Sequence, residues 1–186
     1  MKKTIVLCLF LFSMYKVLMW VEATNGRSDL DRAADQIIIE SGKKLAKKHQ
    51  MRVVAIGGGA ADGITSFSVS FQRLGSPLDC TKARFLIVDC ADQFLKDINQ
   101  DPQVRQFLNI YPFPNKGVSV TIFNYTEDGD DVYYPGINVL QIRKGVIEYN
   151  TSDPGKKGSY KTEVTETYEE AVAILNAENS LNESEP

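Results

Sequence analysis

Residues 64–73 read ITSFSVSFQR, and this stretch decides the fold. Phe67, Val69 and Phe71 alternate with serine or glutamine, so one face of the segment is apolar and the other is polar. Such alternation is typical of antiparallel strands with one buried face and one hydrated face. The sequence therefore predicts a sheet whose apolar side is covered by other elements.

Four further stretches are expected to complete the sheet, at residues 51–56, 118–125, 137–142 and 146–149. The last two are apolar segments on either side of Lys144-Gly145, which is expected to form a two-residue hairpin turn. Residues 57–63 read GGGAADG, and a run this rich in glycine is expected to be a flexible connection between strands.

Capping patterns and apolar periodicity predict four helices, over residues 29–49, 77–98, 101–108 and 167–177. Ser28 is expected to cap the first helix, with Asp31 in the capping-box position. Ser76 is expected to cap the second, because Pro77 suits the first helical position. The buried positions of the second helix are predicted to be Ala83, Leu86, Ile87, Cys90, Phe94 and Ile98.

These elements predict an α+β fold, in the order helix, two strands, two helices, three strands, helix. We expect an antiparallel sheet of about five strands with helices packed on one face, since sheet and helices must each hide an apolar side. Residues 24–178 have the length of a single domain. Residues 179–186 are expected to be a disordered acidic tail.

The amino-terminal residues predict export. Lys2 and Lys3 precede a long apolar run, and the small residues Val21 and Ala23 come after it. A short basic region, an apolar core and small residues are the parts of a secretory signal peptide. We therefore expect a signal over residues 1–23, cleavage between Ala23 and Thr24, and a mature protein in the periplasm or outside the cell.

A membrane anchor is the second interpretation of the same segment. A spanning helix needs about 20 mostly apolar residues, and residues 4–21 come close to this length with Lys16 as the one charge. A lysine near the bilayer centre costs roughly 2.5 to 3.5 kcal/mol. If the segment stays uncleaved, it is the only part of the chain expected to touch a membrane.

The charge balance argues against a nucleic-acid partner. The chain has 21 basic and 24 acidic residues, and its net charge is −3. The one dense basic cluster, at Lys43, Lys44, Lys47 and Lys48, falls at the end of a predicted helix, where cations complement the helix dipole. Nucleic-acid binding depends mainly on phosphate neutralisation by a basic face, so no nucleic acid is expected as a partner.

No cofactor or metal is predicted. Asp62 stands where the dinucleotide-binding pattern needs its third glycine, and the next segment is predicted to be a strand rather than a helix. The acidic stretch 127–131 does not continue as a calcium-binding loop, since Tyr133 and Val139 occupy the positions of its glycine and glutamate. The single histidine excludes zinc sites that need two.

No catalytic residues are predicted either. Cys80 and Cys90 lie ten residues apart on one predicted helix, about 15 Å from one another at 1.5 Å per residue, which is too far for a disulfide. Cys90 is expected to be a core residue. Cys80, in the first helical turn, would have a lowered thiolate pKa if it were exposed. His49 is expected to be a solvated imidazole at a helix end.

Aromatic residues mark a possible contact surface. In the strand 118–125, Val118, Val120 and Ile122 share one face, which leaves Phe123 and Tyr125 on the other. Tyr133 and Tyr134 come after the acidic loop. Exposed aromatic patches often mark partner-binding surfaces, whereas cross-strand pairs that stabilise the sheet are the plainer interpretation.

Several short stretches carry a resemblance: Ala83-Arg84, Ile98-Asn99, Arg105, Tyr111-Pro112-Phe113, Lys144-Gly145 with Tyr149, and residues 166–171. Through them, residues 52–175 resemble small exported proteins of intracellular, chlamydia-like bacteria. The resemblance implies a bacterial envelope or secreted setting, and it implies no activity.

Together these features predict an exported, non-enzymatic domain that binds a protein or another envelope component. The expected surface contains Phe123, Tyr125, Tyr133 and Tyr134. Two alternatives remain open. One is a small secreted hydrolase or thiol enzyme that uses Cys80 with His49 or a carboxylate. The other is a secreted effector that acts on a host.

Overall fold

The computed structural model describes residues 27–156 and 158–183. The predicted signal over residues 1–23, its alternative as an anchor over residues 4–21 and the cleavage point between Ala23 and Thr24 lie outside this part of the chain. Within it, no helix combines the length and the apolar character needed to cross a bilayer.

The fold is α+β, as the sequence predicts, with a six-stranded mixed sheet in the order β1-β2-β3-β4-β5-β6. The strands are β1 (Met51–Ala61), β2 (Gly63–Leu74), β3 (Val118–Tyr125), β4 (Val139–Arg143), β5 (Val146–Ser152) and β6 (Tyr160–Thr167). The helices are α2 (Asp29–Lys48), α3 (Cys80–Gln100), α4 (Pro102–Arg105) and α5 (Tyr168–Glu183), with a 3-10 turn at Asn115–Gly117.

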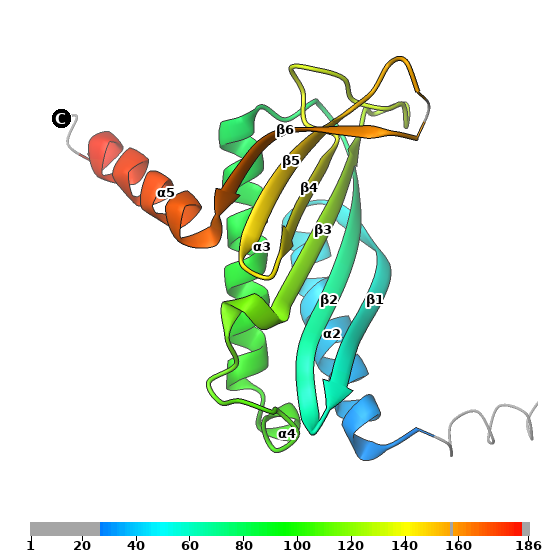
Figure 1. Cartoon of the computed structure of the whole chain (residues 1–186), viewed down its shortest axis with the longest axis vertical. Helices are drawn as coiled ribbons and strands as arrows, with labels where there is room; N and C mark the ends of the chain where they lie inside the picture. The colour runs from blue at the N-terminus through cyan, green and yellow to red at the C-terminus, as the bar shows by residue number, and fades with distance from the viewer. Residues whose placement is uncertain (1–26, 157, 184–186) are drawn as a thin grey trace, which may run out of the picture.

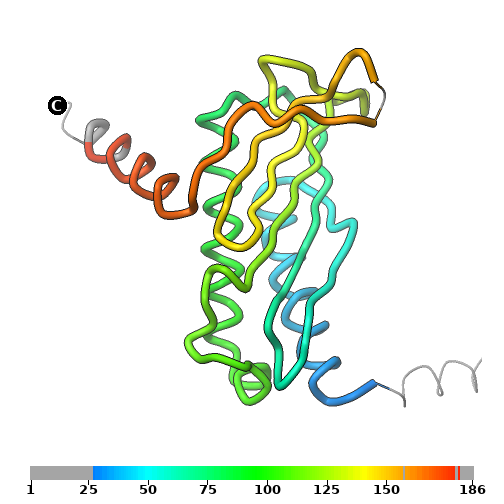
Figure 2. The backbone as a smooth tube through the Cα atoms, in the orientation of Figure 1, coloured from blue at the N-terminus to red at the C-terminus, as the bar shows by residue number. Residues whose placement is uncertain are grey.

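Helices α2 and α3 lie together on one face of the sheet, and the other face carries no described helix (Figure 1). The core between the two layers joins the apolar face of β2 and β3 to the stripe of α3 that the sequence predicts, and all six of those α3 positions are buried. Helix α5 projects away from the sheet beyond α3 (Figure 2).

Two local signals are confirmed. Ser28 and Asp31 form the capping box of α2, in which the Ser28 hydroxyl accepts a hydrogen bond from the Asp31 amide at 3.1 Å. Lys144 and Gly145 both have positive φ, 53° and 77°, which is the backbone of a tight hairpin turn between β4 and β5.

The glycine-rich segment is not a flexible connection, and that prediction is wrong. Gly57, Gly58 and Gly59 belong to β1 and pair with Ser68, Phe67 and Ser66 of β2. A Cβ atom at Gly58 would lie 2.6 Å from the Ser66 carbonyl oxygen, so the strand needs glycine there. The hairpin turns at Asp62 instead.

The sheet is not wholly antiparallel. Strands β2 and β3 are parallel, with Phe67 opposite Val118 and Leu74 opposite Tyr125. The connection between them contains α3 and α4 and returns the chain to the opposite end of the sheet, so the next strand starts in the same direction.

Three element ends also differ from the expectation. Asp79, not Ser76, caps α3, because Leu78 is held outside the helix by a backbone hydrogen bond from Ile137 at 2.9 Å. The short helix α4 ends at Arg105, before the expected residue 108. Helix α5 runs to Glu183, into the stretch 179–186 that was expected to be unstructured.

Candidate functional site

A cleft of about 600 Å³ opens at the end of the sheet where β5 finishes and β6 begins. We call it the tyrosine cleft, after two of the side chains that line it. Its lining residues are Tyr133, Tyr134, Thr151, Ser152, Asp153, Pro154, Lys161 and Glu163.

The loop that carries the two tyrosines is fastened to the ends of two strands. Asp131 forms an antiparallel bridge with Tyr125 of β3, and the Ser152 amide of β5 donates to the Val132 carbonyl at 3.2 Å. Val132 itself is buried. The backbone that precedes the tyrosines is therefore held in place, although Tyr133 is 49% and Tyr134 75% exposed.

Apart from Pro154, the rest of the lining is polar. The Thr151 hydroxyl donates to Glu163 at 3.0 Å, and the Lys161 ammonium lies 3.3 Å from the same carboxylate oxygen. The buried Ser152 hydroxyl has no hydrogen-bond partner among the described residues. The cleft thus offers an ammonium, two carboxylates and two flat rings, the mixture of apolar surface and a few polar groups found in binding sites.

Buried asparagines support the same end of the sheet, and they were not predicted from the sequence. The Asn124 amide donates to the Ile137 carbonyl at 2.9 Å, the Asn138 amide donates to the Asn124 carbonyl at 2.7 Å, and Asn150 accepts from the Thr162 hydroxyl at 2.8 Å. Buried polar networks rigidify a structure where their groups are paired; here the Asn138 Oδ1 atom has no hydrogen-bond partner among the described residues. The signal that could have found them was an asparagine inside apolar strand patterns, away from any turn.

The four predicted aromatic residues are divided between two places. Tyr133 and Tyr134 line the tyrosine cleft, whereas Phe123 and Tyr125 do not. Both of the latter are half-buried on the face of β3 that points away from the helices. Burial raises the pKa of the Tyr160 phenol, and the charges of Tyr125 and Asp131 raise it further.

Cys80 lies beside a buried charge cluster and is not activated. Burial raises the pKa of the Cys80 thiol, and the nearby Glu166 and Asp79 carboxylates also raise it, against the opposing effect of Arg84. The expectation of a lowered pKa depended on an exposed thiol, and Cys80 is half-buried. Cys90 is fully buried in the core, and burial raises the pKa of its thiol to about 12.

His49 is not a solvated imidazole, and that expectation is wrong. Its side chain is 13% exposed, and Nε2 lies 2.7 Å from Oδ2 of Asp89 on α3. The Lys48 ammonium lies 2.6 Å from the same oxygen. This cluster ties the end of α2 to the middle of α3, so His49 is committed to Asp89 and does not serve Cys80.

The Asp89 cluster predicts a specific loss of stability in acid. Burial would raise the pKa of the Asp89 carboxyl, but hydrogen bonds from Lys48 and His49 outweigh it and lower the pKa. A lowered pKa stabilises the fold above the unfolded value of about 3.9 and stops doing so as the pH falls through the folded value. Asp89→Asn should therefore lower the free energy of unfolding by about 1 kcal/mol at pH 7, and this loss should shrink as the pH falls through the pKa of the folded Asp89 carboxyl.

Urea unfolding of the wild type and Asp89→Asn between pH 7 and pH 2 checks this prediction. Asp128→Asn, in an exposed loop, is the matched control and should leave the dependence of the unfolding free energy on pH unchanged. A constant difference between wild type and Asp89→Asn across the whole range would contradict the account.

In the part of the chain that the structure describes, no three histidine, cysteine or acidic side chains form a group able to hold a metal ion. No family model matches the chain, and comparisons with curated proteins and with solved structures found no match either.

Proposed function

We propose that this chain is an exported, non-enzymatic binding domain of the bacterial envelope or secreted space. In this proposal, the tyrosine cleft recognises a protein or another envelope component. The observation that carries it is the pair Tyr133 and Tyr134, two exposed rings on a loop whose backbone is fastened to β3 and β5.

The energetics of association favour such a site. Tyrosine is enriched among the residues that dominate binding energy, because it buries a large ring and still offers a hydroxyl. Binding also costs free energy for every segment that must become ordered. Since the hydrogen bond from Ser152 and the bridge to Tyr125 already order this loop, that cost is small here.

The remaining support comes from the sequence. The basic and apolar residues at the amino terminus predict export, and no part of the mature sequence has the pattern of an enzyme active site. The contacts of Cys80 and His49 point the same way, because each side chain is engaged in a different structural cluster.

The experiment compares two pairs of substitutions. Tyr133→Ser with Tyr134→Ser removes the rings of the cleft, and Phe123→Ser with Tyr125→Ser removes those of the outer sheet face. Phe85→Ser with Ile110→Ser, two exposed apolar side chains away from the cleft, is the control. The exported form of each is purified with its bound components, which mass spectrometry then identifies along with the mature amino terminus.

The first pair should reduce recovery of a specific component at least about tenfold, as expected when hot-spot side chains are removed. The control should leave recovery unchanged. Equal recovery with the wild type and with the Tyr133 and Tyr134 variant would contradict the proposal. A loss confined to the Phe123 and Tyr125 variant would move the binding surface to the outer face of the sheet.

A further inference from the structure

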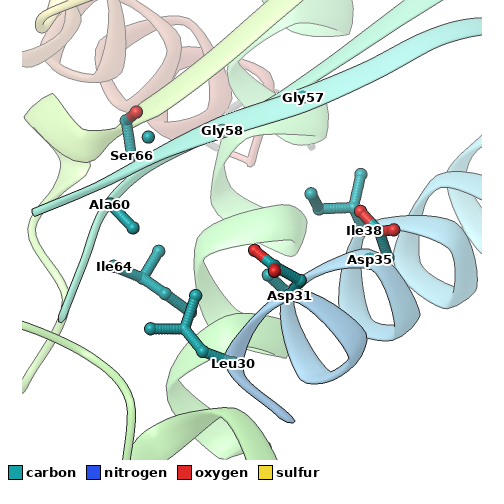
Figure 3. Close-up of a pocket in the computed structure, with 11 residues that line it drawn as sticks. Leu30, Asp31, Asp35, Ile38, Gly57, Gly58, Ala60, Ile64 and Ser66 are labelled. Carbon is teal, nitrogen blue, oxygen red and sulfur yellow. The ribbon is translucent and has the colours of Figure 1, made fainter. Parts of the chain in front are cut away.

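Helix α2 and strand β1 are close together at one end and apart at the other. Near the carboxyl-terminal half of α2, a Cβ atom at Gly42 would lie 3.3 Å from Val53 of β1, so helix and strand are in contact there. Along the amino-terminal half, β1 presents Gly57, Gly58 and Gly59, which have no side chains to fill the space. A groove of about 200 Å³ remains between the two elements (Figure 3).

The groove has an apolar floor and an acidic wall. Leu30 and Ile38 of α2 and Ile64 of β2 supply the apolar surface, and Asp31 and Asp35 lie on the helix side, as Figure 3 shows. Drug-sized ligands occupy pockets of roughly 300 to 1,000 Å³, so this groove is the size for one side chain. An aliphatic stem that ends in a cation fits both surfaces at once.

Strand β1, which borders the groove, is also the edge of the sheet. Its backbone pairs with β2 on one side, and no backbone hydrogen bond from any other described residue reaches it. An unpaired edge accepts a further strand from another chain. The glycines let a second backbone come close, and the exposed side chains of Val54 and Ile56 offer apolar contacts along the same strand.

The two carboxylates keep binding capacity for a cation. Both capping hydrogen bonds to Asp31 use Oδ2, which leaves Oδ1 without a partner among residues 27–156 and 158–183. Asp35 already receives the guanidinium of Arg27, so a basic side chain from outside the helix can reach it. That pair is largely exposed, and exposed pairs contribute little free energy. A competing cation can therefore displace Arg27.

From these features we infer that β1 and the groove together bind an extended peptide segment with a lysine or arginine side chain. The peptide adds to the sheet as a strand beside β1. Its basic residue enters the groove, where the stem lies on Leu30, Ile38 and Ile64 and the charged end meets Asp31 and Asp35. This site lies apart from the tyrosine cleft and shares no lining residue with it.

The test uses a synthetic peptide with blocked ends, Thr-Val-Thr-Lys-Thr-Val-Thr, and the full chain labelled with nitrogen-15. Threonine and valine favour extended structure. Titration should shift the amide resonances of β1 and of the first half of α2. A peptide with norleucine in place of lysine should bind roughly threefold more weakly, because it loses the contacts to both carboxylates. Methylation of alternate peptide nitrogens should abolish binding, since it removes the donors of the added strand.

The double substitution Asp31→Asn with Asp35→Asn should weaken binding of the lysine peptide by the same factor. It should leave the affinity for the norleucine peptide unchanged. Asp128→Asn with Asp130→Asn, in an exposed loop, is the matched control and should bind like the wild type. The Tyr133→Ser and Tyr134→Ser variant should also bind normally, so this result is independent of the proposed function. Equal affinity for the two peptides, shifts that lie outside β1 and α2, or no shifts at millimolar peptide would overturn the inference.

Discussion

Glu166→Ala is expected to lower the free energy of unfolding by about 3 to 5 kcal/mol, the usual cost of removing one partner of a buried ion pair. Glu166 on β6 lies 2.9 Å from Nε of Arg84 on α3, and the side chains are 8% and 12% exposed. The same carboxylate accepts the hydroxyl of Tyr149 on β5. Alanine would leave a buried guanidinium and a buried phenol without an acceptor.

Chemical denaturation measures this loss, with Glu40→Ala as the control because Glu40 is exposed on α2. The control should change stability by less than about 0.5 kcal/mol. A combined variant, Arg84→Met with Glu166→Leu and Tyr149→Phe, should recover most of the stability, since it removes every polar group of the cluster together. A loss below about 1 kcal/mol for Glu166→Ala would mean that the pair is solvated and does not join α3 to the sheet.

Phe67→Ala is expected to lower the free energy of unfolding by about 3 to 5 kcal/mol. Phe67 of β2 is fully buried, and its ring packs edge-to-face on two others. The ring centroids lie 6.4 Å from Phe94 of α3 and 5.1 Å from Phe113, which precedes β3. Removal of this ring leaves a cavity at the point where helix, sheet and connecting segment meet.

Phe85→Ala is the matched control for this second prediction. Phe85 lies on the same helix as Phe94 but is exposed, so its loss should cost less than about 0.5 kcal/mol. Thermal and urea unfolding of both variants would show the difference. Similar costs for Phe67→Ala and Phe85→Ala would contradict the placement of Phe67 at the centre of the core.

The elements that the sequence predicts well are those whose signals are local. Helix α2 carries its own cap at Ser28 and Asp31, and the buried stripe of α3 is predicted by spacing alone. The hairpin turn at Lys144-Gly145 is equally local, because it needs only residues that accept positive φ. Strand β3 has the predicted bounds, since its alternation is complete.

The elements that the sequence predicts poorly depend on partners far away along the chain. Glycine has no preference for strands, and residues 57–59 are extended because β2 pairs with them. The parallel pairing of β2 with β3 has no local signal. Strand β6 is not among the predicted strands, because most of its side chains are polar or charged. Its pairing with β5 makes it an edge strand.

The candidate site also has parts that local sequence signals predict and parts that only the tertiary structure reveals. Alternation placed Phe123 and Tyr125 on the outer face of β3, and their half-burial agrees with that. The tyrosine cleft could not be predicted, because Tyr133 meets Thr151 and Lys161 only after the loop folds back onto two strand ends. The groove between α2 and β1 could not be predicted for a similar reason, since it depends on where α2 lies over β1.

Residues that carry the resemblance to chlamydia-like exported proteins make tertiary contacts in this fold. Arg84, Tyr149 and Glu166 form the buried cluster that joins α3 to the sheet. Asn99 donates to the Phe113 carbonyl at 3.1 Å and accepts from the Phe113 amide at 2.7 Å. Arg105 stacks 3.8 Å from the centre of the Tyr111 ring. Membership of that group remains a prediction, and these contacts give its residues a structural role here.

Site-specific photocrosslinking tests the central claim most directly. A photoreactive benzoylphenylalanine replaces Tyr134 in the cleft, or the exposed Ile110 away from the cleft as the control, and the purified chain is irradiated with envelope components. The account predicts a discrete adduct from position 134 that excess wild-type chain suppresses, and none from position 110. No adduct from position 134, or the same adducts from both positions, would contradict it.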